Sequence, residues 1–150
     1  MPWTMPGKPR TAASRRRDDP VAFKSLDFVY HPSRDVKRDV AYFTEVLGGR
    51  LHFAVEGMGA RVAAIELAPP PPMFLLADHV EGDTPILVYR VPNLRKALTE
   101  LQQRGWREES TFEIPHGPIC SFHAPGGQRV AVYQLRRPAA AASCDCRRDF

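Results

Sequence analysis

The sequence has 150 residues, 43% of them hydrophobic, which is enough for one domain with a core and too little for two domains of ordinary size. Its net charge of +4 belongs to its ends: residues 1–20 carry +3 and residues 136–150 carry +2, which leaves −1 for residues 21–135. Because the part that can fold is nearly neutral, the composition argues against a basic nucleic-acid-binding face.

The sequence also argues against a membrane-inserted or secreted protein. Its longest apolar run has five residues (73–77), whereas a membrane-spanning helix needs about 20. The arginines 15–17 precede acidic residues and Pro20 instead of the apolar stretch of a secretory signal. Three cysteines, two of them near the C-terminus, give no disulfide framework. We therefore expect a cytoplasmic protein with reduced cysteines and with neither nucleic-acid nor membrane partners.

The two ends of the chain differ in composition from the middle. Residues 1–22 are rich in Pro, Arg, Ser and Ala without periodicity, which predicts a disordered basic arm. Residues 137–150 contain four consecutive alanines and then a polar stretch, which predicts a flexible tail because so short a helix without an apolar face is marginal. The ordered body is expected over residues 23–136.

The first half of this body predicts a strand, a helix and three further strands. Ser33 or Asp35 can cap the helix, because a side-chain oxygen there accepts from a free N–H group of the first turn. Apolar spacings of four, three and four residues form one helical face, and the glycines 48–49 end the helix. That face consists of Val36, Val40, Phe43 and Leu47. The strands are expected at 26–30, 51–56, 61–67 and 73–77.

The second half repeats this order. Asn93 caps a helix whose apolar side chains are Leu94, Leu98 and Leu101, and each of these follows its counterpart in the first helix by 58 residues. Strands are expected at 85–90, 109–114, 120–123 and 129–135. The repeat predicts an α+β fold: two tandem βαβββ modules, at about 25–78 and 84–136, which form a curved mixed sheet around a concave pocket.

These segments resemble the vicinal oxygen chelate superfamily, which includes glyoxalase I, bleomycin-resistance proteins, fosfomycin-resistance transferases and extradiol dioxygenases. The resemblance covers about residues 25–136 and implies a homodimer, since members often pair. It rests on 26–36 (LDFVYHPSRDV), 41–49 (AYFTEVLGG), 86–91 (ILVYRV), 94–105 (LRKALTELQQRG) and 124–133 (APGGQRVAVY).

Metal-dependent members of this superfamily place His, Gln or Glu ligands on the first and last strand of each module. The resemblance carries these positions to Phe28 and Ile86 on the first strands, and to Phe74 (within one residue) and Ala131 on the last. Among the neighbouring positions, Asp27 alone could coordinate an ion. Because a divalent site needs at least three converging ligands, we expect a pocket with no metal and no other cofactor.

The resemblance further implies that one face of these strands lines the pocket, and residues on one face alternate along a strand. An aromatic and aliphatic lining with two phenols and one guanidinium suits a small, partly apolar organic ligand. Arg90 would favour an anionic ligand unless it pairs with an acid of the protein, and the tyrosines could instead fill the core. The expected lining is Phe28, Tyr30, Phe74, Ile86, Val88, Arg90, Ala131 and Tyr133.

Other candidate chemistry is weak. Glu113 is the one carboxylate that we expect on an inner strand as a possible base. His116, Cys120 and His123 have an inviting spacing, but in a strand Cys120 and His123 point to opposite faces. Cys144 and Cys146 supply half a zinc site and no more.

We therefore predict a small-molecule-binding protein similar in architecture to the bleomycin-resistance type. A second possibility is an enzyme of the same superfamily, either a metal-independent isomerase or lyase, or a lyase or dioxygenase with a displaced metal site. A third is an interaction protein whose basic ends contact an anionic partner.

Overall fold

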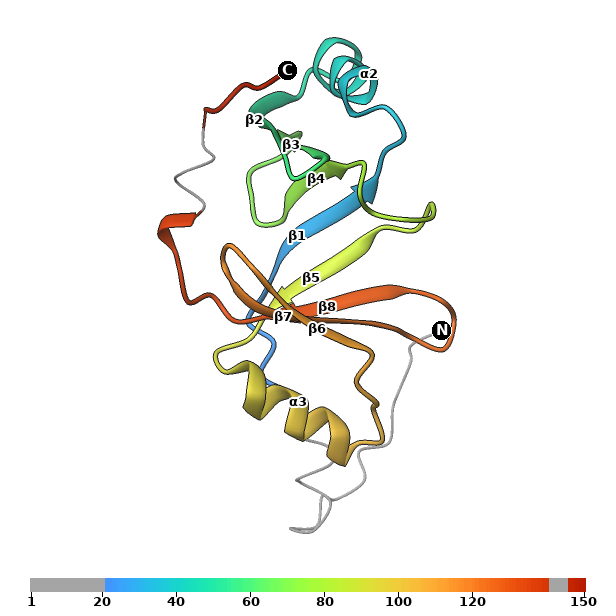
Figure 1. The fold of residues 1–150 in the computed structure, drawn as a ribbon, viewed down its shortest axis with the longest axis vertical. Coiled ribbons are helices and arrows are strands. Elements are labelled where there is room, and N and C mark those ends of the chain that lie inside the picture. The colour runs from blue at the N-terminus through green and yellow to red at the C-terminus, as the bar shows by residue number, and fades with distance from the viewer. Residues whose placement is uncertain (1–20, 141–145) are drawn as a thin grey trace, which may run out of the picture.

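The computed structural model describes residues 21–140 and 146–150. Two modules follow one another, each a strand, a helix and three further strands (Figure 1), so the predicted α+β fold is confirmed. The first comprises β1 (Ser25–Pro32), α2 (Val36–Ala41), the π-type turn η1 (Tyr42–Val46), β2 (Arg50–Gly57), β3 (Ala60–Glu66) and β4 (Met73–Ala77). The second comprises β5 (Ile86–Arg90), α3 (Leu94–Gln103), β6 (Ser110–Ile114), β7 (Gly117–His123) and β8 (Arg129–Tyr133).

All of these strands form one mixed sheet in the order β2-β3-β4-β1-β5-β8-β7-β6. At its centre β1 and β5 pair antiparallel and join the modules, whereas the first and last strand of each module run parallel. Tyr30 lies opposite Leu75 in one parallel pair, and Val88 lies opposite Ala131 in the other. Because Tyr30 and Val88 are 58 residues apart, as the helical repeats are, Leu75 and Ala131 hold equivalent positions.

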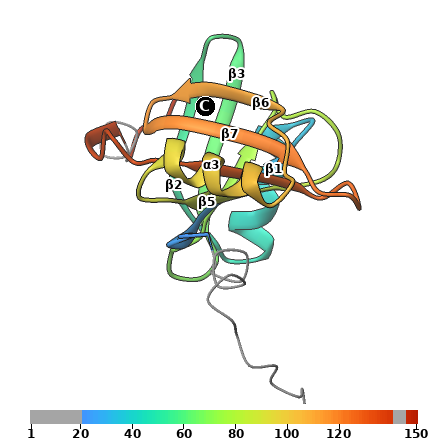
Figure 2. The ribbon, with the colours of Figure 1, turned by 90° about the horizontal axis from the view of Figure 1, so that it is seen from below.

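The two helices cover the outer face of the sheet at opposite ends of the molecule, and Figure 2 views it from the α3 end. Asp35 and Asn93 cap them as predicted, each accepting at 3.0 Å from the backbone N–H three residues later. None of the helices in the described ranges is long and apolar enough to cross a membrane. Two cores lie under the helices: Val36, Ala54, Ala63, Ile65 and Leu76 under α2, and Val91, Leu94, Ala97, Cys120 and Val132 under α3.

The predicted apolar face of the first helix is correct except at its end. Val40 and Phe43 pack against the core under α2, but Leu47 is 46% exposed. After Ala41 the helix widens into η1, where the backbone N–H of Leu47 donates to the carbonyl oxygen of Tyr42, five residues earlier. The wider turn changes the number of residues per turn, so Leu47 leaves the buried face and its predicted core position is wrong.

Both ends of the ordered body extend further than predicted. Val21 packs under α3, so the ordered body already includes the last residues of the expected arm 1–22, while residues 1–20 lie outside the described ones. Residues 146–150 belong to the expected flexible tail 137–150, yet they lie along β2, where Arg148 pairs with Ala54. Their composition gave no sign of this contact, because it depends on a strand almost 100 residues away.

Candidate ligand-binding site

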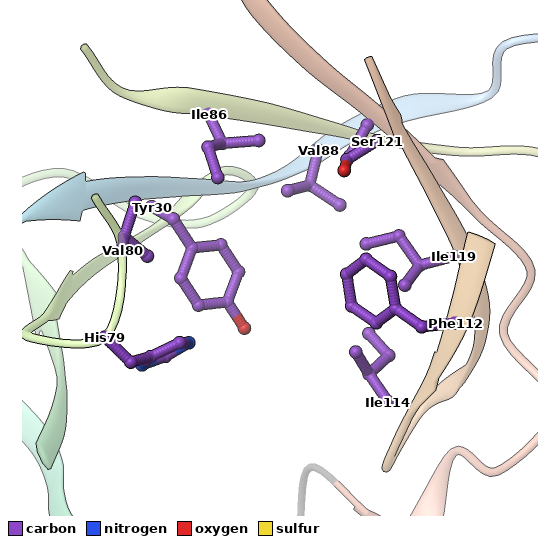
Figure 3. Close-up of a pocket in the computed structure, with 10 residues that line it drawn as sticks. Tyr30, His79, Val80, Ile86, Val88, Phe112, Ile114, Ile119 and Ser121 are labelled. Atoms are coloured by element: carbon purple, nitrogen blue, oxygen red, sulfur yellow. The ribbon is translucent and has the colours of Figure 1, made fainter. Parts of the chain in front are cut away.

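A cavity lies on the inner face of the sheet, against the second module. It holds about 490 Å³ of space, including open solvent at its mouth. Tyr30, Ile86, Val88 and Ala131, all predicted to line a pocket, line this one. Six further residues complete the lining: His79, Val80, Phe112, Ile114, Ile119 and Ser121 (Figure 3).

These six residues were not expected from the sequence, for two different reasons. Phe112 and Ile114 alternate along β6, as Ile119 and Ser121 do along β7, so the period of the strands could have placed them on the inner face. By contrast, His79 lies in the connection between the modules, where no periodicity indicates the path of the chain.

The cavity is apolar apart from a few groups. Figure 3 shows the Tyr30 hydroxyl pointing into the open space between His79 and the side chains of β6 and β7, with the Ser121 hydroxyl above Ile119. Of the described residues that line the cavity, none carries a carboxylate, an ammonium or a guanidinium group. The cavity therefore offers hydrogen-bonding groups to a ligand, but its lining provides no fixed charge.

The connection between β4 and β5, residues 78–85, forms one wall and is fixed at both ends. Asp78 donates from its backbone N–H to the Arg61 carbonyl oxygen (3.2 Å) and accepts at Oδ1 from the Arg61 N–H (2.9 Å). Arg129 on β8 donates from Nη1 to the carbonyl oxygens of Glu81 (2.5 Å) and Thr84 (3.2 Å). These contacts hold His79 against the cavity.

A polar cluster joins the two modules beside the cavity. Asp27 is only 8% exposed; its Oδ2 lies 2.9 Å from Arg90 Nε and accepts a hydrogen bond from the Tyr133 hydroxyl. Burial, followed by the hydrogen bond to Asp27, raises the pKa of Tyr133, so this phenol stays protonated. Arg90 thus pairs with an acid of the protein, which was the alternative to an anionic ligand, and its placement gives no support to such a ligand.

Strand alternation alone would turn Asp27 away from the face that carries Phe28. The pairing of β1 with β5 shifts register between Leu26 and Phe28, which leaves Asp27 as an extra residue. Such a bulge redirects a side chain, so Asp27 reaches Arg90 and Tyr133, which its position in the sequence did not indicate.

Phe28 and Tyr133, both expected to line the pocket, are not among its lining residues and instead pack with Val88, Ile119 and Ala131 in one core cluster. Their ring centroids lie 5.7 Å apart, and the ring of His116 lies 5.3 Å from that of Phe28. Burial and then the nearby Arg137 lower the pKa of His116.

Phe74 was expected on the pocket face within one residue, and the structure places it on the other face. It lies opposite Val29 in the pairing of β1 with β4, packs under α2, and has its ring centroid 5.1 Å from that of Phe43. The uncertain register of the fourth strand caused this error, and the inner-face position is its neighbour Leu75.

The other candidate groups lie apart from the cavity. Glu113 projects between Phe112 and Ile114 from the edge strand β6, with its side chain 62% exposed and 2.8 Å from Arg137. Cys120 is buried under α3, while His123 pairs with Glu109 at 2.8 Å, so the His116, Cys120 and His123 spacing forms no cluster. Cys146 is exposed, and Cys144 lies outside the described residues.

No family model and no curated protein matches this sequence. Its structure does match solved structures over nearly their whole length. A methylmalonyl-CoA epimerase from Mycobacterium tuberculosis superposes with a TM-score of 0.64 at 18% identity, over 80% of this chain and 93% of that one. The chain has the vicinal oxygen chelate fold.

Two further solved structures with this fold are similar at 12% identity. A hypothetical protein from Bacillus halodurans gives a TM-score of 0.64, over 77% of this chain and 96% of the other. A Streptomyces coelicolor methylmalonyl-CoA epimerase in complex with 2-nitronate-propionyl-CoA gives 0.61, over 76% and 96%. At these identities the likeness shows the fold alone.

Four positions on the inner face correspond to the metal-ligand positions that the resemblance implies. With the register corrected, the four positions that the resemblance assigns to ligands are Phe28, Leu75, Ile86 and Ala131, and none of these side chains has a donor atom. Within residues 21–140 and 146–150, no three His, Cys, Asp or Glu side chains come close enough together to hold an ion.

Proposed function

We propose that this chain binds a small, neutral, mainly apolar organic molecule in the cavity of its second module, without a metal ion. The observation that carries the proposal is the lining: aliphatic and aromatic side chains surround the space above Ala131, a position that the superfamily uses for a metal ligand. A concave apolar site with few polar groups is typical of small-molecule binding.

The lining also favours a neutral ligand over a charged one. An ion in this cavity would lose its water without gaining an opposite charge, which is costly. The hydroxyls of Tyr30 and Ser121 can instead orient a ligand hydroxyl or carbonyl group. A hydroxylated aromatic ring combines these requirements.

We propose binding and not the epimerase activity of the similar solved structures. The positions that would hold a metal ion carry apolar side chains, and Glu113, the one base expected from the sequence, projects from the sheet edge and pairs with Arg137. The cavity therefore supports holding a ligand better than it supports proton transfer.

Calorimetric titration with 1-naphthol and with 1-naphthoate tests the proposal, because the two probes share a ring system and differ in charge. We expect saturable binding of naphthol, about tenfold or more tighter than that of naphthoate, and unchanged after treatment with EDTA. Equal binding of both probes, or loss of binding on chelation, would contradict it.

A variant pair locates the binding. Ala131→Leu fills the cavity and should abolish naphthol binding, whereas Ala124→Leu makes the same change in the β7–β8 connection, outside the cavity. Melting temperatures show whether both variants are folded. If Ala131→Leu binds naphthol as the unaltered chain does, the site lies elsewhere.

A further inference from the structure

A tyrosine ring and a phenylalanine ring lie on opposite walls of the cavity. Tyr30 belongs to β1 at the centre of the sheet, and Phe112 belongs to β6 at its edge. In Figure 3 the open space lies between these two rings, with Ile114 and Ile119 beside Phe112. Both rings are seen face-on in this view, so each turns its edge, and not its face, toward the open space.

Both rings project from paired strands. Tyr30 lies opposite Ile86 in the pairing of β1 with β5, and its ring centroid is 6.3 Å from that of Phe28. Phe112 lies opposite Ile119 in the pairing of β6 with β7. The backbone of the sheet therefore presents the two ring edges to a ligand, and no loop has to move to bring them there.

Phe112 differs from the other apolar residues of the lining in its exposure. It is 47% exposed, whereas the others are buried or half-buried. An exposed apolar ring in the wall of a cavity loses contact with water when a ligand covers it, which favours binding. The position of Phe112 therefore indicates a contact that a ligand completes.

The orientation of the two rings determines which ligand ring they attract. An aromatic ring is electron-rich on its faces and electron-poor at its edge, so the edge of one ring attracts the face of another. A flat aromatic ring between Tyr30 and Phe112 presents one face to each edge. A saturated ring of similar size has no electron-rich face, and a fluorinated aromatic ring has an electron-poor one. The arrangement therefore distinguishes ligands by the electron distribution of their rings as well as by apolar area.

We propose that Tyr30 and Phe112 select an electron-rich aromatic ring, such as that of a phenol or an indole, which binds with its two faces against their edges. The Ser121 hydroxyl in the same lining can bind a hydroxyl substituent of that ring. This inference rests on the proposed function, because it names the class of ligand that the same cavity takes.

Displacement of 1-naphthol by three uncharged alcohols tests the selection. Benzyl alcohol, pentafluorobenzyl alcohol and cyclohexylmethanol carry the same hydroxymethyl group on an electron-rich, an electron-poor and a saturated ring. We expect benzyl alcohol to bind about threefold or more tighter than either of the others, although the other two have the larger apolar surface. Equal affinities, tighter binding of the fluorinated alcohol, or no displacement by any of the three would overturn the inference.

Phe112→Leu tests the contribution of one ring. It keeps an apolar side chain and removes the aromatic edge, so the preference for benzyl alcohol over pentafluorobenzyl alcohol should fall about twofold or more. Phe23→Leu is the matched control, because Phe23 is 41% exposed but stacks on Tyr89 and does not line the cavity; it should keep the full preference. Melting temperatures show whether both variants are folded. An unchanged preference in a folded Phe112→Leu chain would overturn the role of Phe112.

The same titrations separate a failure of this selection from a failure of the proposed function. If 1-naphthol does not bind to the unaltered chain, the proposed function is wrong and the selection is wrong with it. If 1-naphthol binds but the three alcohols displace it equally well, the cavity binds small apolar molecules and the selection by Tyr30 and Phe112 is wrong.

Discussion

The two modules share one topology, but the cavity lies against the second. Seven of its ten lining residues belong to the second module, and one, Tyr30, belongs to a strand of the first module. At equivalent positions the first module has Leu75, which is 3% exposed, and the second has Ala131, whose side chain is three carbons smaller. A duplicated scaffold can thus use one copy of a position for packing and the other for space.

The largest effect is expected from a substitution that gives the first module the same residue as the second at this position. Leu75→Ala should lower the free energy of unfolding by about 2–5 kcal/mol, because it removes buried methyl groups and leaves a cavity. Urea denaturation measures the change. The control Leu47→Ala removes the same atoms from a side chain that is 46% exposed, and should cost less than about 1 kcal/mol. Equal costs would mean that Leu75 does not fill the inner face.

The next effect concerns the junction between the modules. Asp27→Asn removes the charge that faces Arg90 and weakens the acceptor of the Tyr133 hydroxyl, so it should cost about 1–3 kcal/mol of stability. Tyr133→Phe, which removes one hydrogen bond and keeps the ion pair, should cost less. Thermal unfolding distinguishes the two variants. An Asn variant as stable as the unaltered chain would show that the cluster does not hold the modules together.

A smaller effect is expected at residues 78–85, which connect the modules and form one wall of the cavity. Arg129→Gln shortens the side chain that holds Glu81 and Thr84, so residues 78–85 should move more freely and naphthol affinity should fall about fivefold, or about 1 kcal/mol. Arg95→Gln, on the exposed surface of α3, should leave the affinity unchanged. The same calorimetric titration compares the two variants. Equal naphthol affinities would show that Arg129 does not hold residues 78–85 in the position that binding requires.

The smallest expected effect is a pH dependence of stability that comes from His116 in the second module. Burial and then Arg137 lower the pKa of His116, while Asp27 opposes that shift, so the unfolded chain binds this proton more readily. Above the ordinary pKa of 6.5 this imidazole is neutral in both the folded and the unfolded chain, and it costs no stability. As the pH falls from 6.5 through the lower pKa of the folded chain, the unfolded chain takes up the proton first, and the free energy of unfolding decreases. His116→Gln should lose less stability between pH 7 and pH 5 than the unaltered chain. Identical losses would contradict this assignment.

The sequence predicted the fold because the pattern repeats. Helix caps at Asp35 and Asn93, apolar helical faces 58 residues apart, and strands of alternating character all gave the same two modules. Departures from the regular period, which the sequence did not indicate, changed the position of Leu47 and of Asp27. The π-type turn exposes Leu47, and the bulge at Asp27 turns a carboxylate inward, both by inserting residues into an otherwise regular pattern.

The candidate site was predicted only in part because half of it depends on long-range geometry. Tyr30, Ile86, Val88 and Ala131 followed from the pocket face that the resemblance implies, extended along each strand by alternation. The prediction for Phe74 was wrong because a shift of one residue in register exchanges the two faces of a strand. His79 enters the lining through the path of a loop, and Phe150 reaches β2 from the far end of the chain; no local period encodes either contact.

Methyl NMR during a titration with 1-naphthol tests the central claim most directly, because it shows where the probe binds. We predict shift changes for Ile86, Val88, Ile119 and Ala131, with Ile65 and Val132 on the helix side unchanged, and the same result in EDTA. Changes confined to the helix side, or changes that vanish when metal ions are removed, would contradict a metal-free cavity in the second module.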